Sequence, residues 1–96
     1  MPIRYTWSPE KNAANLRKHR ITFERAVRIF EGYTLEYHDD RYAHEEVREV
    51  AIGLVETDEI VVIFTEVEDD KRRIISARSA NRYERQVYWE ARRRDD

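Results

Sequence analysis

The stretch REVAIGLVETDEIVVIFTEV, residues 48–67, decides the fold, because it predicts the centre of a β-sheet. Its first part, 48–55, has valine, isoleucine and leucine at alternate positions, as a strand with one buried face does. After the polar turn ETDE, the second part, 60–67, begins with an apolar run that is typical of a strand buried on both faces. The two strands are therefore predicted to pair as an antiparallel hairpin.

The sequence on either side of this hairpin predicts the other elements. Three more strands are predicted by alternation, at 3–7, 34–38 and 72–80. Helices are predicted to begin at Ser8, Thr22 and Asn81, each of which can cap a first turn. The resulting order is β-α-α-β-β-β-β-α. It predicts a single α+β domain, residues 1–96, with helices packed on an antiparallel sheet.

Local signals fix the details of these helices. Ala13 and Leu16, with Ala14 beside them, are predicted to supply the apolar face of the first helix, which ends near His19. Gly32 is expected to stop the second helix. The residues Asn81 to Glu84 fit a capping box at the start of the last helix.

Composition narrows the class of protein. The 96 residues include no cysteine and no apolar run of membrane-spanning length, so we expect a cytoplasmic domain without disulfides or thiolate chemistry. Both ends of the chain are basic and the middle is acidic. Residues 1–30 carry seven Lys/Arg and two Asp/Glu, and residues 71–96 carry nine Lys/Arg and four Asp/Glu. Residues 31–70 carry only two Lys/Arg but fourteen Asp/Glu. If the two basic ends fold together, their shared face attracts phosphate. A solvated surface of mixed charge is the alternative.

The first basic cluster lies at the end of the first predicted helix and consists of Arg17, Lys18, His19 and Arg20. Cations at this place complement the helix dipole, which is the structural interpretation. The functional interpretation is that these side chains form an anion-binding site.

The second basic cluster surrounds the start of the last predicted helix. Arg78 closes the last strand and Arg82 opens the helix, whose free N–H groups favour an anion. Arg85 and Trp89 follow at spacings of three and four residues, so they are predicted to share a helix face with Arg82, where Trp89 can stack on a base. A solvated arginine face with a half-buried Trp89 is the alternative.

The sequence gives little support for a metal site or for a serine or cysteine hydrolase site. His38-Asp39-Asp40 and His44-Glu45-Glu46 contain metal-ligand types, but their spacing matches no standard site, and an acidic loop explains them. Gly32 and Gly53 are the only glycines, so neither a Gly-rich phosphate loop nor a nucleophile elbow exists. No metal or cofactor is expected. The remaining groups suit RNA cleavage in which the substrate's own 2′-OH attacks the adjacent phosphate.

Three motifs span nearly the whole chain: W-S-P-E-K-N-A-A-N-L-R-K-H with I-T-F-E-R-A, then E-E-V-R followed by Gly53, and finally R-I-I-S-A-R-S-A-N-R-Y-E-R with Tyr88. In these the chain resembles the BrnT family of toxins from bacterial type II toxin–antitoxin systems. It departs from the family at Ser8, where an acid is usual, and at Arg20, where glycine is usual. Arg20 is therefore expected in a left-handed C-cap, at a cost of about 1 kcal/mol for a non-glycine residue.

The resemblance implies a RelE-like fold and a ribonuclease that arrests translation and growth. It also implies a BrnA-type antitoxin, one half of which is a ribbon-helix-helix DNA-binding domain. The toxin would then bind operator DNA only indirectly, through this antitoxin. The sequence leaves open a homodimer or a larger toxin–antitoxin assembly. The alternative function is a non-catalytic module that binds RNA or a partner protein through the same arginine-rich face.

Residue roles follow from combining the motifs with this chemistry. The residues expected to be catalytic are Lys18, His19, Glu46, Arg48, Arg78 and Arg82. Those expected to bind RNA are Arg17, Arg20, Arg85 and Trp89. His19 is the candidate acid or base because an imidazole titrates near neutral pH. Glu46 is a second base candidate and is paired with Arg48 in this hypothesis, although a structural role for Asn15, His19 and Glu46 stays open.

Overall fold

The computed structural model describes residues 2–39 and 47–95 and confirms the predicted α+β class. In chain order the elements are β1 (Arg4–Thr6), α1 (Pro9–His19), α2 (Phe23–Ala26), the 3-10 helix η1 (Val27–Glu31), β2 (Leu35–Asp39), β3 (Arg48–Val55), β4 (Asp58–Glu68), β5 (Lys71–Ser79) and α3 (Arg82–Asp95). The second predicted helix is thus divided into one α-helical turn and a 3-10 segment.

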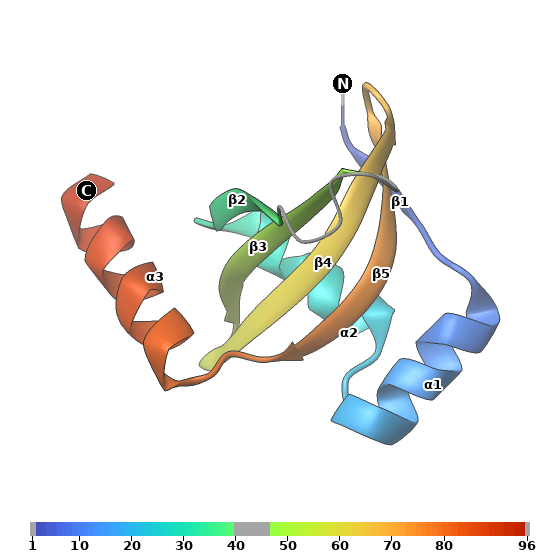
Figure 1. The fold of residues 1–96 in the computed structure, drawn as a ribbon, viewed down its shortest axis with the longest axis horizontal. Helices are drawn as coiled ribbons and strands as arrows, with labels where there is room; N and C mark the ends of the chain where they lie inside the picture. Colours follow the sequence, from blue (N-terminus) through green and yellow to red (C-terminus); the bar gives the residue numbers. More distant parts are fainter. Residues whose placement is uncertain (1, 40–46, 96) are drawn as a thin grey trace.

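The strands form one five-stranded sheet in the order β1-β5-β4-β3-β2 (Figure 1). The predicted hairpin is confirmed: β3 and β4 are antiparallel neighbours, with Val55 opposite Asp58 at the turn. β1 lies parallel to β5, with Arg4 opposite Lys71, so the sheet is mixed and the predicted all-antiparallel sheet is wrong. The physical reason is that no hairpin joins β1 to β5, so no turn reverses the chain between them.

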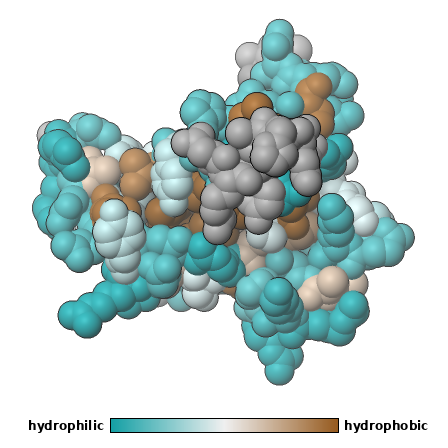
Figure 2. All heavy atoms as spheres, in the orientation of Figure 1, coloured by the Kyte–Doolittle hydropathy of each residue, from teal (hydrophilic) through white to brown (hydrophobic). Residues whose placement is uncertain are grey.

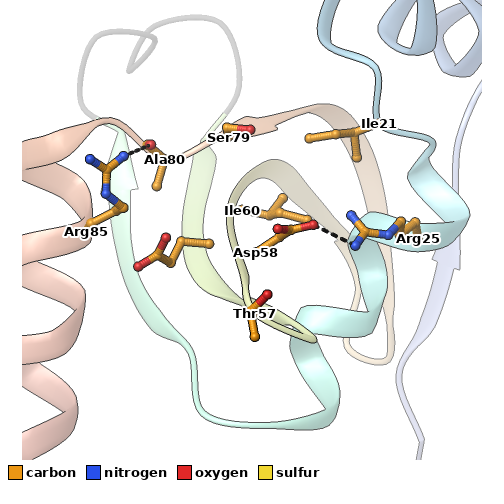
Figure 3. Close-up of a pocket in the computed structure, with 9 residues that line it drawn as sticks. Ile21, Arg25, Thr57, Asp58, Ile60, Ser79, Ala80 and Arg85 are labelled. Atoms are coloured by element: carbon orange, nitrogen blue, oxygen red, sulfur yellow. Dashed lines mark hydrogen bonds and ion pairs between the residues drawn. The ribbon is translucent and has the colours of Figure 1, made fainter.

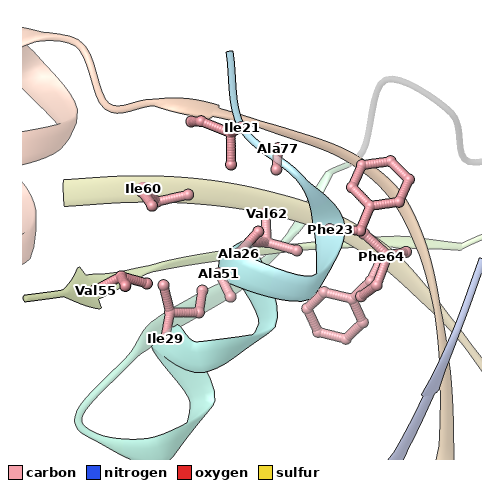
Figure 4. Close-up of a cluster of buried hydrophobic side chains, with 11 residues drawn as sticks. Ile21, Phe23, Ala26, Ile29, Ala51, Val55, Ile60, Val62, Phe64 and Ala77 are labelled. Atoms are coloured by element: carbon pink, nitrogen blue, oxygen red, sulfur yellow. The ribbon is translucent and has the colours of Figure 1, made fainter. Parts of the chain in front are cut away.

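Each face of the sheet carries its own buried cluster. Val50 and Ile52 belong to one cluster and Ala51, between them, to the other, as the alternation of side chains along a strand requires. Helices α1, α2 and η1 lie on the face that contains Ala51, and α3 covers part of the face that contains Val50 and Ile52 (Figure 1). Figure 4 shows the first cluster, which comprises Ile21, Phe23, Ala26, Ile29, Ala51, Val55, Ile60, Val62, Phe64, Ile74 and Ala77.

The outer surface on the side seen in Figure 2 is mostly hydrophilic, and hydrophobic residues gather between α3 and the sheet. Tyr88 of α3 is buried there against the second cluster, with Val87 and Trp89 packed beside it. Within residues 2–39 and 47–95, no helix combines the length and the apolar character needed to span a bilayer.

Helix α1 is attached to the sheet by amide side chains, so the predicted apolar face is wrong. Ala13, Ala14 and Leu16 are exposed. Asn15 is only 6% exposed; it donates to the carbonyl oxygens of Ile21 and Ala77, both at 2.9 Å, and accepts from the Ala77 N–H at 3.1 Å. A structural role for Asn15 is therefore confirmed. Hydrogen bonds rather than apolar burial fix the end of α1 beside β5.

Gly53 allows η1 to lie close to β3. A Cβ atom at this position would stand 2.8 Å from the Ile29 Cβ and 3.1 Å from the Thr34 Cγ2. A side chain would therefore push η1 away from the sheet.

We expect Gly53→Ala to lower the free energy of unfolding by about 1–3 kcal/mol, because the added methyl group overpacks the contact with Ile29. Urea unfolding of the parent and the variant measures this loss. Gly32→Ala is the matched control, since a Cβ there meets no atom within 4 Å. Equal stability of the parent and Gly53→Ala would show that η1 can shift without cost.

Candidate functional site

A cavity of about 240 Å³ opens at the end of the sheet where the β3–β4 turn and the end of β5 meet (Figure 3). Arg25 of α2 and Arg85 of α3 reach toward it from opposite sides. The other residues that line it are Ile21, Thr57, Asp58, Glu59, Ile60, Ser79 and Ala80. The cavity therefore joins the segment after α1 to the connection between β5 and α3.

The acidic groups of this cavity already have partners. Asp58 pairs with Arg25 at 2.8 Å, and this bond raises the pKa of Arg25 further above its ordinary value. Glu59 accepts a hydrogen bond from the Trp89 Nε1–H at 2.9 Å. Arg85 donates to the Ala80 carbonyl oxygen at 2.9 Å and has no other partner within the described ranges. Arg85 thus keeps hydrogen-bond donors for an anion at the cavity rim.

Arg78 is held by Glu84 in a bidentate ion pair, with N–O distances of 2.7 and 2.8 Å. Glu84 is only 8% exposed and also closes the predicted capping box: it accepts from the Asn81 N–H, and its own N–H donates to the Asn81 Oδ1, each at 2.8 Å. The bond from Arg78 is the main reason that the pKa of Glu84 lies below its ordinary value. Arg78 therefore fixes the first turn of α3 as well as carrying charge.

Arg82, expected from the sequence to be catalytic, and Trp89, expected to bind RNA, have different surroundings. Arg82 is exposed at the start of α3, and its side chain has no partner among residues 2–39 and 47–95. Trp89 is half-buried: its ring packs edge-on against Tyr88 at 5.2 Å, and the Arg92 guanidinium lies 5.3 Å from the ring centre. This matches the alternative given for Trp89, and its role as a base platform stays a prediction.

The basic cluster at the end of α1 has the backbone expected of it. Arg20 takes the left-handed conformation, with φ 63°, and its N–H donates to the Leu16 carbonyl oxygen at 2.9 Å, so the expected C-cap is confirmed. Arg17 and Lys18 are exposed and His19 is half-buried. In the part of the chain that the structure describes, the side chains of these four residues have no ionic or hydrogen-bonded partner.

The structure places the two basic clusters at one end of the sheet but on different faces. The end of α1 lies on the face of the sheet that contains the Ala77 side chain. Arg78, one residue later, points to the opposite face, where it pairs with Glu84 of α3. The cavity connects the two: Ile21, which follows Arg20, lines it together with Ser79 and Arg85. An extended anionic chain across this end of the sheet can therefore reach both clusters.

Other candidates lie elsewhere. Arg48 opens β3 opposite Asp39, at the other end of that strand from the cavity. Glu46 and His44 lie outside the described residues. His38, considered as a metal ligand, has its Nδ1 2.8 Å from Glu49 Oε1. Within residues 2–39 and 47–95, no group of three or more His, Cys, Asp or Glu is placed to hold a metal ion.

Sequence reasoning missed Arg25 and the second role of Glu84. Arg25 meets Asp58 only through the tertiary fold, so no local pattern announces it. Glu84 was predicted to be part of a helix cap, but its bond to Arg78 was not predicted. The only sequence signal for this bond is that the two residues lie six positions apart, on either side of the β5–α3 connection.

Comparison with known proteins identifies the family of this chain. Residues 7–84 match the family model described as "Ribonuclease toxin, BrnT, of type II toxin-antitoxin system". The crystal structure of the Brucella abortus ribonuclease toxin BrnT superposes with a TM-score of 0.68 at 26% identity, covering 83% of this chain and 99% of that one. A search of curated proteins found no match. Because the family model covers most of the chain, this protein belongs to the BrnT family of ribonuclease toxins of type II toxin–antitoxin systems.

Proposed function

We propose that this chain is an endoribonuclease that cleaves RNA without a metal ion and thereby arrests translation and growth. The observation that supports it best is the set of unpaired cations around one end of the sheet. Arg82 and the side chains of Arg17, Lys18 and Arg20 have no described acidic partner, and Arg85 keeps free donors. Such groups bind the RNA backbone and stabilise the charge that grows on a phosphorane.

In this mechanism the 2′-OH of the substrate attacks the adjacent phosphate, and the 5′-oxygen of the next nucleotide leaves. Arg78 and Arg82 stabilise the phosphorane, and Lys18 contributes charge. His19 and Glu46 are the proposed acid and base. Glu84 is unsuited to the role of base, because the Arg78 bond lowers its pKa and makes its carboxylate a weak proton acceptor.

The proposed partner is a co-encoded BrnA-type antitoxin with a ribbon-helix-helix half, which neutralises the toxin in the cytoplasm and binds operator DNA for the pair. Membership in a type II toxin–antitoxin family supports an antitoxin partner. We also propose that the sheet and its helices are related to the RelE-like toxins.

The test is incubation of the purified chain with RNA in buffer containing EDTA. We expect cleavage to persist, because the 2′-OH of the substrate is the nucleophile and the proposed acid, base and cations are all side chains of this protein. Loss of cleavage in EDTA with recovery on adding Mg²⁺ or Mn²⁺ would contradict the metal-free mechanism. A retarded but intact RNA would instead identify the non-catalytic binding module.

A further inference from the structure

A second hollow lies between β2 and the start of α3, on the face of the sheet opposite α1. Its volume is about 430 Å³, within the range of about 300–1,000 Å³ that small ligands occupy in proteins. Leu35 and Tyr37 line it from β2; Asn81, Tyr83, Glu84 and Val87 line it from the start of α3. We call it the tyrosine groove.

Two aromatic rings are exposed at this groove. Tyr37 is 44% exposed and Tyr83 is 71% exposed, so both offer apolar surface that the fold itself does not bury. A single exposed aromatic residue is ordinary, but apolar groups that share one exposed hollow are typical of an interaction site. The groove adjoins the strip of hydrophobic residues between α3 and the sheet in Figure 2.

Among the described residues that line the groove there is no unbalanced acidic group, and one cation, Arg82, is next to two lining residues in the chain. The carboxylate of Glu84 is neutralised by Arg78 and capped by the Asn81 N–H, so it does not repel an anion as a bare charge would. Arg82, which lies between Asn81 and Tyr83 in the chain, is exposed and has no partner among residues 2–39 and 47–95. Burial, and next the charge of Glu84, raise the pKa of Tyr37, so its hydroxyl stays protonated at neutral pH and adds no negative charge to the groove.

We propose that Tyr37 and Tyr83 form a platform on which one unpaired nucleobase of the RNA substrate stacks, with a neighbouring phosphate on Arg82. The proposal rests on the ribonuclease function proposed above. Aromatic rings beside an unpaired guanidinium are the combination with which proteins bind single-stranded nucleic acid. The stacked base must be unpaired, because a duplex hides the faces of its bases. The substrate is therefore single-stranded at this position.

The binding test uses a fluorescein-labelled, fully 2′-O-methylated single-stranded RNA, which cannot be cleaved because it lacks a free 2′-OH. We expect Tyr37→Leu and Tyr83→Leu each to weaken its binding about tenfold in fluorescence anisotropy. Tyr37→Phe and Tyr83→Phe keep the ring and should bind like the parent. Val67→Ala, a change at an exposed apolar position far along β4, is the control that should change nothing. Thermal melts verify that each variant is folded.

A single abasic site, moved along the same RNA, separates stacking from any indirect effect. We expect one position at which the abasic site weakens binding to the parent but not to Tyr83→Leu. Parent-like binding by both leucine variants, or equal affinity for the duplex, would overturn the platform. So would leucine variants that bind RNA normally but lose the co-encoded antitoxin, which would assign the groove to that protein. A parent that binds RNA through the platform yet never cleaves it would instead contradict the proposed function alone.

Discussion

Replacing Arg82 with alanine is expected to lower kcat/KM for RNA cleavage about a hundredfold or more, because a preorganised donor would be lost from the charged transition state. The thermal midpoint should not change, since the Arg82 side chain is exposed and has no described partner. Arg82→Lys should recover only part of the activity, because lysine keeps the charge but loses the bidentate fork. Initial rates on one defined RNA measure all three proteins.

Arg93→Ala is the matched control for this experiment, since Arg93 is exposed on the same helix and is likewise without a described partner. Arg92 would be a poor control, because it lies over Trp89 and donates to the Tyr88 hydroxyl at 3.3 Å. If Arg82→Ala and Arg93→Ala both cleave RNA at the parental rate, Arg82 has no part in catalysis.

The substitution Glu84→Gln should lower the free energy of unfolding by about 3 kcal/mol at neutral pH, because the bidentate ion pair with Arg78 is lost and the cap of α3 is weakened. Denaturant unfolding measures the difference. The same reasoning makes Arg78→Ala unsuitable as a simple test of catalysis, since any loss of activity would be mixed with loss of structure. A double variant, Arg78→Met with Glu84→Gln, removes both charges and should recover part of the stability.

The stabilisation by Glu84 should also depend on pH. The pKa of Glu84 is lowered in the folded protein from its ordinary value of 4.5, chiefly by the bond from Arg78. Its contribution is therefore fully present above that ordinary value and is lost as the pH falls through the lower, folded-state pKa. The stability difference between parent and Glu84→Gln should shrink below about pH 4.5. A difference that stays constant to strong acid would show that the ion pair does not hold the cap.

Local features of the fold were predictable because their causes lie close together in the chain. The hairpin of β3 and β4 and the capping box of Asn81 each depend on a few neighbouring residues. The left-handed Arg20 was expected from the family resemblance, because glycine is usual at that position. The parallel pairing of β1 was not predictable, because its partner β5 lies almost a chain length away. A structural role for Asn15 was left open from the sequence, but its partner Ala77 was not predictable, because an asparagine in a helix carries no sign of which distant strand it will bond.

The candidate site was predictable in composition but not in arrangement. Sequence identified the cations at the end of α1 and the start of α3, and the structure brings them to one end of the sheet. Periodicity cannot tell that Arg78 is bound by Glu84 or that the two clusters belong to different faces, because both facts depend on side-chain direction at the last residues of β5.

The position of β5 has a consequence for synthesis on the ribosome. β1 can pair only with β5, and Asn15 of α1 finds its partner only in Ala77 on the same strand. The first quarter of the chain therefore reaches its final position only after the last quarter has been made, whereas β3 can pair with β2 and with β4 earlier. The proposed phosphate-binding end of the nascent protein is thus completed only when its translation is nearly finished.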